Sequence, residues 1–512
     1  MLINKKINDN ARKSTHKARA IMIQGTMSNA GKSLICAGLC RILKQDGYRV
    51  APFKSQNMAL NSGVTKDGLE MGRAQVVQAE AAGIEPSVLM NPILLKPVTN
   101  MGSQLIVCGQ VRGNYEAAEY FRIKHTLIPE IRKAYDELAS QNDIIVIEGA
   151  GSPAEINLSK GDFANMGMAK LAGAPVLLIG DIDRGGVFAQ LYGTIKLLPA
   201  DEQDIIKGLV INKFRGDANL LSDGLDMISS LTDKPVAGVI PMLDVDIDDE
   251  DSLSSRFYNN NNEAIIDIAV IKLPKISNFT DMAPLEATEG VGVRYITRAQ
   301  DFDRPDLIII PGTKNTISDL MWMRTAGIEE QIVKLAKAGT PVIGICGGYQ
   351  MLGMSITDKA GTEGGGSITG IGLLPVHTEF KTEKLLAKTS ATFLKVNGLL
   401  RSLSGVNITG YEIHMGKTYL THEASSLLTL NGNEVMGCQN GNIYGSYMHG
   451  FFESNECRSA ILRDLSEHKG LTFNKNILKW EEYKERQYDM LAEGIRSNLN
   501  MKMIYDIIEK GI

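Results

Sequence analysis

Runs of consecutive apolar residues, separated by helical patterns and turns, recur along most of the chain. Continuous Val and Ile runs of this length are typical of strands that are buried on both faces of a parallel sheet. They predict an α/β fold made of two three-layer domains with mainly parallel sheets. The first group of runs comprises residues 143–147, 175–179, 208–211 and 235–240, and the second comprises 265–271, 306–310, 341–345 and 442–448.

A change of composition separates the two groups. Residues 244–251 are acidic, and residues 258–263 are polar and lack any periodicity, which is typical of a linker. Beyond about residue 454 the pattern becomes helical and charged, which predicts an extension packed on one of the domains. We therefore predict a polar tail at 1–19, a first domain at 20–252, a linker at 253–263, a second domain at 264–455 and a helical extension at 456–512.

The amino-acid composition agrees with the predicted two-domain fold and adds little to it. The chain has 512 residues, 44% of them hydrophobic and 22% charged, with a net charge of −5, and it is long enough for at least two full cores. Its basic residues are scattered and give no sign of nucleic-acid binding, and no apolar run approaches the length of a membrane span. Six cysteines without a paired metal spacing indicate a reducing compartment, so we expect a cytoplasmic protein. The oligomeric state is not predicted.

A glycine-rich loop follows the apolar strand at residues 20–24. Its sequence, Gly-Thr-Met-Ser-Asn-Ala-Gly-Lys-Ser at 25–33, is that of a phosphate-binding loop with one residue more than the standard spacing. In such a loop backbone amides hold phosphate oxygens, Lys32 neutralises the β/γ charge, and the Ser33 hydroxyl reaches Mg²⁺. The predicted ATP-binding residues are Gly25, Thr26, Asn29, Gly31, Lys32 and Ser33. The long spacing resembles that of dethiobiotin synthetase and its relatives, which use ATP to activate a carboxylate.

Acidic residues supply candidates for a magnesium site. Glu148 stands at the carboxyl end of the strand at 143–147, where a second Mg²⁺ contact is expected in a P-loop domain. The alternative is that its carboxylate only caps the following turn. Asp67 and Glu70 are further candidates, with a surface or structural role as the alternative.

A cysteine lies in a tight turn between a strand and a helix. Cys346 follows the apolar run 341–345 and precedes Gly347 and Gly348. A side chain in such a turn projects out of the fold, and the helix N-terminus favours a thiolate and offers N–H groups to an oxyanion. His449 is a plausible base about a hundred residues later. A structural buried cysteine is the alternative.

These residues resemble the class I glutamine amidotransferases, whose Cys–His pair releases ammonia from glutamine through a thioester. The resemblance rests on the motif Gly-x-Cys-Gly-Gly-x-Gln around Cys346. That family has a glutamate two residues after the histidine, whereas this chain has Phe451. Glu453 is a weak candidate for the third group, and a Cys–His dyad is the favoured expectation. The loop that contains Gly312 resembles the family's oxyanion loop, with a plain βα turn as the alternative.

Longer motifs resemble the cobyric acid synthase family. They lie at 52–62, 70–75, 90–97, 148–157, 181–188, 211–217 and 410–416, and the similarity extends from about residue 20 to about 452. The resemblance implies an ATP-, Mg²⁺- and glutamine-dependent ligase that amidates the b, d, e and g propionates of the corrinoid adenosylcobyrinic acid a,c-diamide. A cobyrinic acid a,c-diamide synthase and a partitioning-type P-loop ATPase are the alternatives.

Four basic residues are candidates for holding substrate carboxylates. A corrinoid with a rim of propionates requires cations in its cleft. Arg73, Lys96, Arg184 and Arg215 all lie in or beside the motifs named above. For each of them, an ordinary salt bridge is an equally good interpretation.

Overall fold

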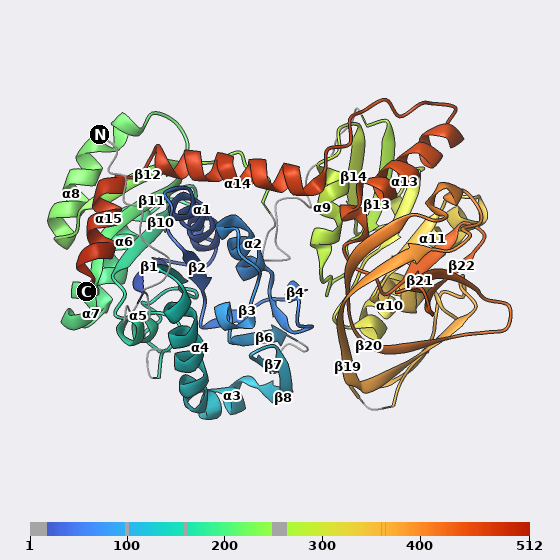
Figure 1. Ribbon diagram of the computed structural model, residues 1–512, viewed down its shortest axis with the longest axis horizontal. Helices are drawn as coiled ribbons and strands as arrows, with labels where there is room; N and C mark the ends of the chain where they lie inside the picture. Colours follow the sequence, from blue (N-terminus) through green and yellow to red (C-terminus); the bar gives the residue numbers. More distant parts are fainter. Residues whose placement is uncertain (1–17, 98–101, 158–160, 248–263, 360, 364) are drawn as a thin grey trace, which may run out of the picture.

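Two α/β bodies lie side by side and are joined along one edge by a long helix near the end of the chain (Figure 1). The computed structural model describes residues 18–97, 102–157, 161–247, 264–359, 361–363 and 365–512. The predicted linker at 253–263 and most of the predicted tail lie outside these residues. Within the described part of the chain, none of the helices combines the length and apolarity needed to cross a bilayer.

The first body is built on a six-stranded sheet in which every strand pairing is parallel. Side chains alternate between its two faces, so that Met22 points into one apolar core while Ile21 and Ile23 point into the other. In spatial order the strands are β12 (Val236–Pro241), β11 (Ile206–Phe214), β10 (Val176–Asp181), β1 (Arg19–Gly25), β9 (Ile144–Glu148) and β2 (Val50–Phe53).

Helices from distant parts of the sequence cover this sheet. One core contains residues of α4 (Ile128–Gln141), α5 (Met166–Ala172), α6 (Val187–Leu197) and α8 (Ser222–Thr232). The other contains residues of α1 (Lys32–Gln45), α14 (Trp480–Arg496) and α15 (Met501–Lys510). Helix α2 (Arg73–Ala82) contributes to both. The C-terminal helices α14 and α15 therefore complete the first body, as Figure 1 shows.

Between β2 and β9 the chain forms smaller elements that face the second body (Figure 1). A two-stranded antiparallel hairpin leads directly into α2, and its turn lies against the backbone of the second body at Leu386. The hairpin strands are β4 (Ser62–Val64) and β5 (Glu70–Gly72), and the neighbouring sheet contains β3 (Gln56–Met58), β6 (Ile93–Pro97), β7 (Gly102–Val107) and β8 (Gln110–Glu116), followed by α3 (Ala117–Ile123).

The second body has an eleven-stranded sheet with a parallel half and a largely antiparallel half. The parallel half is β14 (Val291–Ile296), β13 (Ile266–Ile271), β15 (Leu307–Ile310), β16 (Val342–Ile345) and β23 (Ile443–Ser446). The other half is β22 (Glu434–Asn440), β21 (Ser425–Leu430), β19 (Val376–Phe393), β20 (Asn407–Leu420), β17 (Ser355–Asp358) and β18 (Gly366–Thr369). Helices α9 (Ala283–Glu286), α10 (Thr316–Thr325), α11 (Ile328–Lys337), α12 (Gly347–Leu352) and α13 (Asn455–His468) belong to this body.

The predicted α/β class with mainly parallel sheets is confirmed. Within the predicted extension 456–512, α13 packs in the second core through residues such as Ile461, whereas α14 and α15 pack on the first sheet.

Candidate active sites

The glycine-rich loop connects β1 to α1 at the carboxyl edge of the first sheet. Gly31 has φ 97°, and a Cβ there would lie 2.1 Å from the Asn212 amide nitrogen, so only glycine fits. Asn29 is also left-handed, with φ 61°. The Lys32 ammonium folds over the loop and donates to the carbonyls of Met27 at 2.9 Å and Gly151 at 3.0 Å. The structure thus brings Gly25, Thr26, Asn29, Gly31, Lys32 and Ser33 into one loop.

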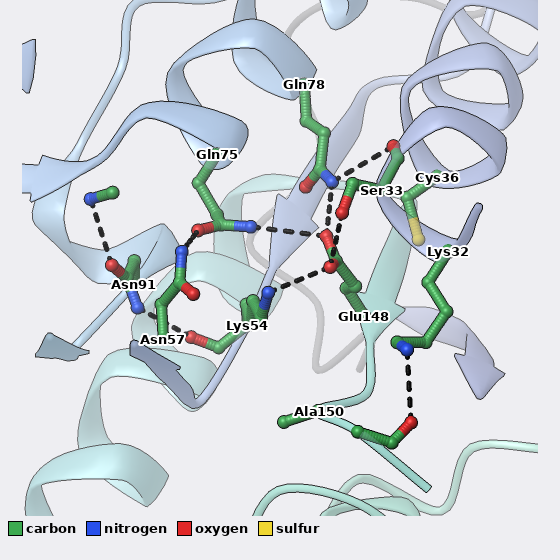
Figure 2. A network of polar contacts seen from close by, with 12 residues as sticks. Lys32, Ser33, Cys36, Lys54, Asn57, Gln75, Gln78, Asn91, Glu148 and Ala150 are labelled. Carbon is green, nitrogen blue, oxygen red and sulfur yellow. Dashed lines mark hydrogen bonds and ion pairs between the residues drawn. The ribbon is translucent and has the colours of Figure 1, made fainter. Parts of the chain in front are cut away.

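A buried carboxylate faces this loop and accepts hydrogen bonds from four side chains (Figure 2). Glu148, at the end of β9, is 1% exposed. The Ser33 hydroxyl donates to it at 2.7 Å and the Lys54 ammonium at 2.9 Å. From α2, the amide groups of Gln78 and Gln75 donate at 2.6 and 3.3 Å.

These donors keep the carboxylate charged. Burial by itself raises the pKa of Glu148, but the Lys54 ammonium and the hydrogen bonds from Ser33 and Gln78 outweigh burial and hold the pKa below its usual range. Glu148 and Ser33 are oxygen ligands of the kind that Mg²⁺ uses together with nucleotide phosphates, for which one or two protein ligands suffice. Within the described residues, no cluster of three or more His, Cys, Asp or Glu side chains is arranged to bind a metal by itself.

Sequence reasoning missed three of the four donors. Lys54, Gln75 and Gln78 lie on the chain after β2 and on α2, and the first two fall within motifs that carried the family resemblance without a chemical role. Asn57 positions Gln75 by donating to its side-chain oxygen at 2.9 Å. A run of amides and a lysine next to an apolar strand is a weak signal, because their convergence on Glu148 depends on the fold.

The remaining metal and substrate candidates of the first domain lie in different places and do not form one site. Asp67 lies in the exposed turn between β4 and β5, and among the described contacts none joins it to Ser33 or Glu148. Lys96 is buried and binds Glu70 at 2.8 Å. Arg184 and Arg215 are exposed on the loops after β10 and β11, where Arg215 pairs with Asp183 at 3.0 Å.

Arg73 begins α2 on the side that faces the second domain. It lines a cleft of about 570 Å³ together with residues of both domains, among them Glu80, Lys388 and Tyr411. Gln75 and Gln78 of the same helix contact Glu148 instead. Helix α2 therefore carries residues of this cleft and residues of the predicted nucleotide site.

Cys346 occupies a strained turn between β16 and α12. Its φ is 51°, a positive value that residues other than glycine seldom adopt. The two glycines after it permit close packing, because a Cβ on Gly348 would lie 1.9 Å from the Ile310 carbonyl and one on Gly347 2.7 Å from Thr313. The elbow is therefore fixed against the loop after β15, which also contains Gly312.

His449 is brought to this turn by the neighbouring strand. β23 pairs in parallel with β16, with Ile345 opposite Ser446, and the chain reaches His449 three residues later. A Cβ on Gly312 would lie 3.2 Å from the His449 ring. Cysteine, histidine and the glycine-containing loop therefore converge at one edge of the sheet.

Asp281 is the carboxylate that holds the histidine. Its Oδ2 accepts a hydrogen bond from His449 Nδ1 at 2.7 Å, and its Oδ1 accepts one from the Gly450 amide at 3.0 Å. Both side chains are buried, at 6% and 1% exposure. Sequence reasoning missed Asp281, because it lies in the short 3₁₀ turn Phe279–Met282, far from His449 along the chain. The weak candidate Glu453 lies beyond Gly450 instead and also lines the cleft.

This arrangement favours a protonated histidine. Burial by itself lowers the pKa of His449, but the carboxylate of Asp281 and the neighbouring Cys346 outweigh it, and together they raise the pKa to about 10. His449 Nε2 makes no hydrogen bond within the described residues. The arrangement therefore favours an imidazolium, whose second nitrogen is available for proton transfer.

Comparisons with known proteins agree with this geometry. A family model of the CobQ/CobB/MinD/ParA nucleotide binding domain matches residues 21–253, and one of the CobB/CobQ-like glutamine amidotransferase domain matches residues 267–457. The chain therefore belongs to the class of proteins in which a nucleotide-binding domain is fused to a glutamine amidotransferase domain.

Relatives narrow this class to one family. A cobyric acid synthase of Ruminiclostridium cellulolyticum is 56% identical over 503 residues, which cover 97% of this chain and 98% of that protein. One of Lachnoclostridium phytofermentans is 54% identical, with 97% and 100% covered, and one of Salmonella agona is 48% identical, with 96% and 99% covered. The chain belongs to the cobyric acid synthase family, which confirms the predicted resemblance. It is a carbon–nitrogen ligase that uses ATP and takes nitrogen from glutamine.

Proposed function

We propose that the chain converts adenosylcobyrinic acid a,c-diamide into adenosylcobyric acid by amidating its b, d, e and g propionates. The observation that carries this proposal is the match to cobyric acid synthases over nearly the whole length of both proteins. The matches to a nucleotide-binding domain and to a glutamine amidotransferase domain support it further. We also propose the division into domains at 20–252 and 264–455, which the two separate sheets support.

In the proposed glutaminase step, His449 holds the proton of the Cys346 thiol, and the thiolate sulfur attacks the amide carbon of glutamine. His449 carries a proton at neutral pH and delivers it from Nε2 to the nitrogen that leaves as ammonia. Backbone N–H groups at Gly347 and in the loop of Gly312 stabilise the oxyanion, with Gly348 allowing the close approach. The neutral imidazole then takes a proton from water, whose oxygen attacks the thioester. This releases the Cys346 thiolate beside the imidazolium, together with glutamate, whose new carboxyl group gives its proton to solvent.

Asp281 has an orienting role in this scheme. By accepting from Nδ1, it fixes the tautomer and direction of the ring, and it stabilises the imidazolium form. This places a carboxylate in the role that a glutamate two residues after the histidine fills elsewhere in the class, where this chain has Phe451.

In the proposed ligase step, a substrate carboxylate is activated by phosphoryl transfer from ATP, and ammonia then displaces the phosphate. The loop residues Gly25, Thr26, Asn29 and Gly31 would hold the phosphates, and Lys32 would neutralise their charge. Ser33 and Glu148 would bind Mg²⁺, which supplies charge neutralisation at the transferred group. Lys54 then has a second potential partner in the phosphates.

Candidates for the substrate carboxylates differ in their availability. Arg184 and Arg215 are exposed at the carboxyl edge of the sheet, where ligands bind in open α/β folds, so we propose them as corrinoid contacts. Lys96 is already engaged with Glu70, and Asp67 lies away from the loop, which makes a structural role the better proposal for both. Arg73 lies at the interdomain cleft.

The test is the mass of the product formed from adenosylcobyrinic acid a,c-diamide with ATP, Mg²⁺ and glutamine. Four successive replacements of a hydroxyl by an amino group are expected, each consuming one ATP and one glutamine. A reaction that ends after two replacements, starting from cobyrinic acid, would identify an a,c-diamide synthase instead. Turnover that does not depend on a corrinoid would overturn the proposal.

A further inference from the structure

Asn278 lies where the two domains meet and contacts both of them. It follows β13, is 3% exposed and adopts a left-handed conformation with φ 52°. Its Nδ2 donates to the Ser62 carbonyl of β4 at 3.1 Å and to the Tyr411 hydroxyl of β20 at 2.7 Å. A carbonyl oxygen can only accept, so the contact with Ser62 determines which end of the amide faces the interface.

Both of the groups that hold His449 are connected to Asn278. The Tyr411 ring stacks on the His449 imidazole, with centroids 5.2 Å apart and planes 14° apart, and the two backbones exchange hydrogen bonds of 3.2 and 2.9 Å. On the other side, the Asp281 amide donates to the Asn278 carbonyl at 3.1 Å. One residue thus contacts the support of the ring face and the support of Nδ1.

The first-domain partner of Asn278 is held firmly. The Ser62 hydroxyl donates to Glu70 at 2.8 Å across the hairpin, and Lys96 donates to both of these side chains. Lys384 of β19 also binds Glu70, across the domain interface. The Ser62 carbonyl is therefore presented by a hairpin that ion pairs fix against the second domain.

We propose that Asn278 is a positioning residue for glutamine hydrolysis, which aligns His449 through Tyr411 and Asp281 and makes this alignment depend on the β4–β5 hairpin of the first domain. The inference rests on the proposed role of His449 in the glutaminase step. It adds that the ligase domain supplies part of the support of the glutaminase site.

The main test replaces Asn278 with glycine, which keeps the left-handed backbone free of strain while removing the amide. Glutamine-dependent synthesis is expected to fall about 10-fold in kcat, as suits the loss of buried hydrogen bonds that orient an acid–base group, with KM for glutamine little changed. Synthesis from ammonium chloride should stay at the wild-type rate. Tyr411→Phe removes the same hydrogen bond from its other end, so it should have a similar effect and add little in the double variant.

Ser402→Ala is a matched control, because it removes a hydrogen bond of the second domain, the 2.6 Å contact with Asp464, which touches neither Asn278 nor His449. It should keep wild-type rates with both nitrogen sources. Lys384→Met loosens the hairpin from the second domain and should lower glutamine-dependent synthesis less than Asn278→Gly does, with no further loss when the two are combined.

Four outcomes would overturn the inference: wild-type glutamine-dependent turnover in Asn278→Gly, equal loss with both nitrogen sources, additive losses in either double variant, or a loss of the same size in Ser402→Ala. A wild-type enzyme that releases no glutamate from glutamine would instead overturn the proposed function.

Discussion

The two sites differ in how their central ionisable groups are satisfied. Glu148 accepts from four side chains, whereas His449 has one strong partner at Nδ1 and no described hydrogen bond at Nε2. At the proposed nucleotide site, protein donors occupy the Glu148 oxygens that the proposed Mg²⁺ would bind, so metal binding there would have to displace some of these donors. At the proposed glutaminase site, Asp281 already fixes one ring nitrogen of His449 and leaves Nε2 for proton transfer. If both proposed assignments hold, the source of ammonia is preformed, whereas the ligase site is completed by its ligands.

Backbone strain is distributed in the same unequal way. In the nucleotide loop, positive φ values fall on Gly31 and on Asn29, residue types that tolerate them. In the glutaminase site the positive φ falls on Cys346 itself. Strain that persists at a reactive side chain has to be supported by its surroundings, which here are the tightly packed glycines after it.

Replacing Cys346 with alanine should have the largest effect, because it removes one of the two proposed activities and leaves the other. Glutamine-dependent synthesis is expected to be abolished, because no other group can form the thioester, while synthesis from high ammonium should persist near the wild-type rate. Product formation with each nitrogen source provides the measurement. Equal loss with both sources would show that the two sites are not chemically separate.

Lys32→Ala tests the proposed nucleotide site in the same way. Amide formation should fall roughly 10²- to 10³-fold with either nitrogen source, because the charge on the transferred phosphoryl group is no longer neutralised. The unfolding temperature and the basal release of glutamate from glutamine should change little. Near-normal synthesis would contradict the assignment of the loop.

Asp281→Asn tests the proposed glutaminase site through the pH dependence of glutamine-dependent turnover. Glutamine-dependent turnover should fall roughly 10²-fold at neutral pH, because an amide neither fixes the imidazolium nor keeps its pKa high. Burial then lowers the pKa of His449, so the activity that depends on the protonated ring should be lost at lower pH than in the wild-type enzyme. Asp281→Glu keeps the charge and should retain more activity. A pH profile identical to that of the wild type would contradict the role of Asp281.

The ion pair of His449 with Asp281 also predicts how the free energy of unfolding depends on pH. Because the folded-state pKa of His449 is raised from 6.5 to about 10, the stabilisation is fully present below pH 6.5 and is lost as the pH rises through 10. The free energy of unfolding of Asp281→Asn, measured in urea, should therefore differ most from that of the wild type near pH 6.5, and the difference should shrink towards pH 10. A difference that grows with pH would contradict the ion pair.

Arg215→Ala should have the smallest effect. We expect KM for the corrinoid to rise roughly 3- to 10-fold, as for the loss of one solvent-exposed ionic contact with the substrate. The existing pair with Asp183 is exposed, so the unfolding temperature should stay the same. The measurement is steady-state kinetics at saturating ATP and glutamine, and an unchanged KM would remove Arg215 from the proposed substrate contacts.

How much of this could be predicted depends on where each group lies along the chain. The loop that ends at Ser33, the carboxylate Glu148 and the proposed nucleophile Cys346 each follow an apolar strand directly, and parallel strands bring their carboxyl ends to one edge. The local pattern was therefore enough to predict their positions in the fold, while their roles stay predictions.

Asp281, Gln78 and Asn278 could not be predicted in this way. Each acts through a partner that lies far away in the sequence, and their own segments carry only ordinary polar residues. Phe451, which departs from the class pattern, was the one sign that the carboxylate beside His449 had to come from another segment.

The path of the chain at its C-terminus has a consequence for synthesis on the ribosome. Helices α14 and α15 cover one face of the first sheet, and α14 is anchored there by Arg41, which binds Glu485 and Asp489. These helices emerge only after the whole second domain has been translated. Nascent first domains therefore carry a face that α1 covers only in part, and the apolar surface left open there is of the kind that chaperones bind and that promotes aggregation. Premature termination just before Trp480 would leave that face open permanently, although every proposed catalytic residue of both sites would be present.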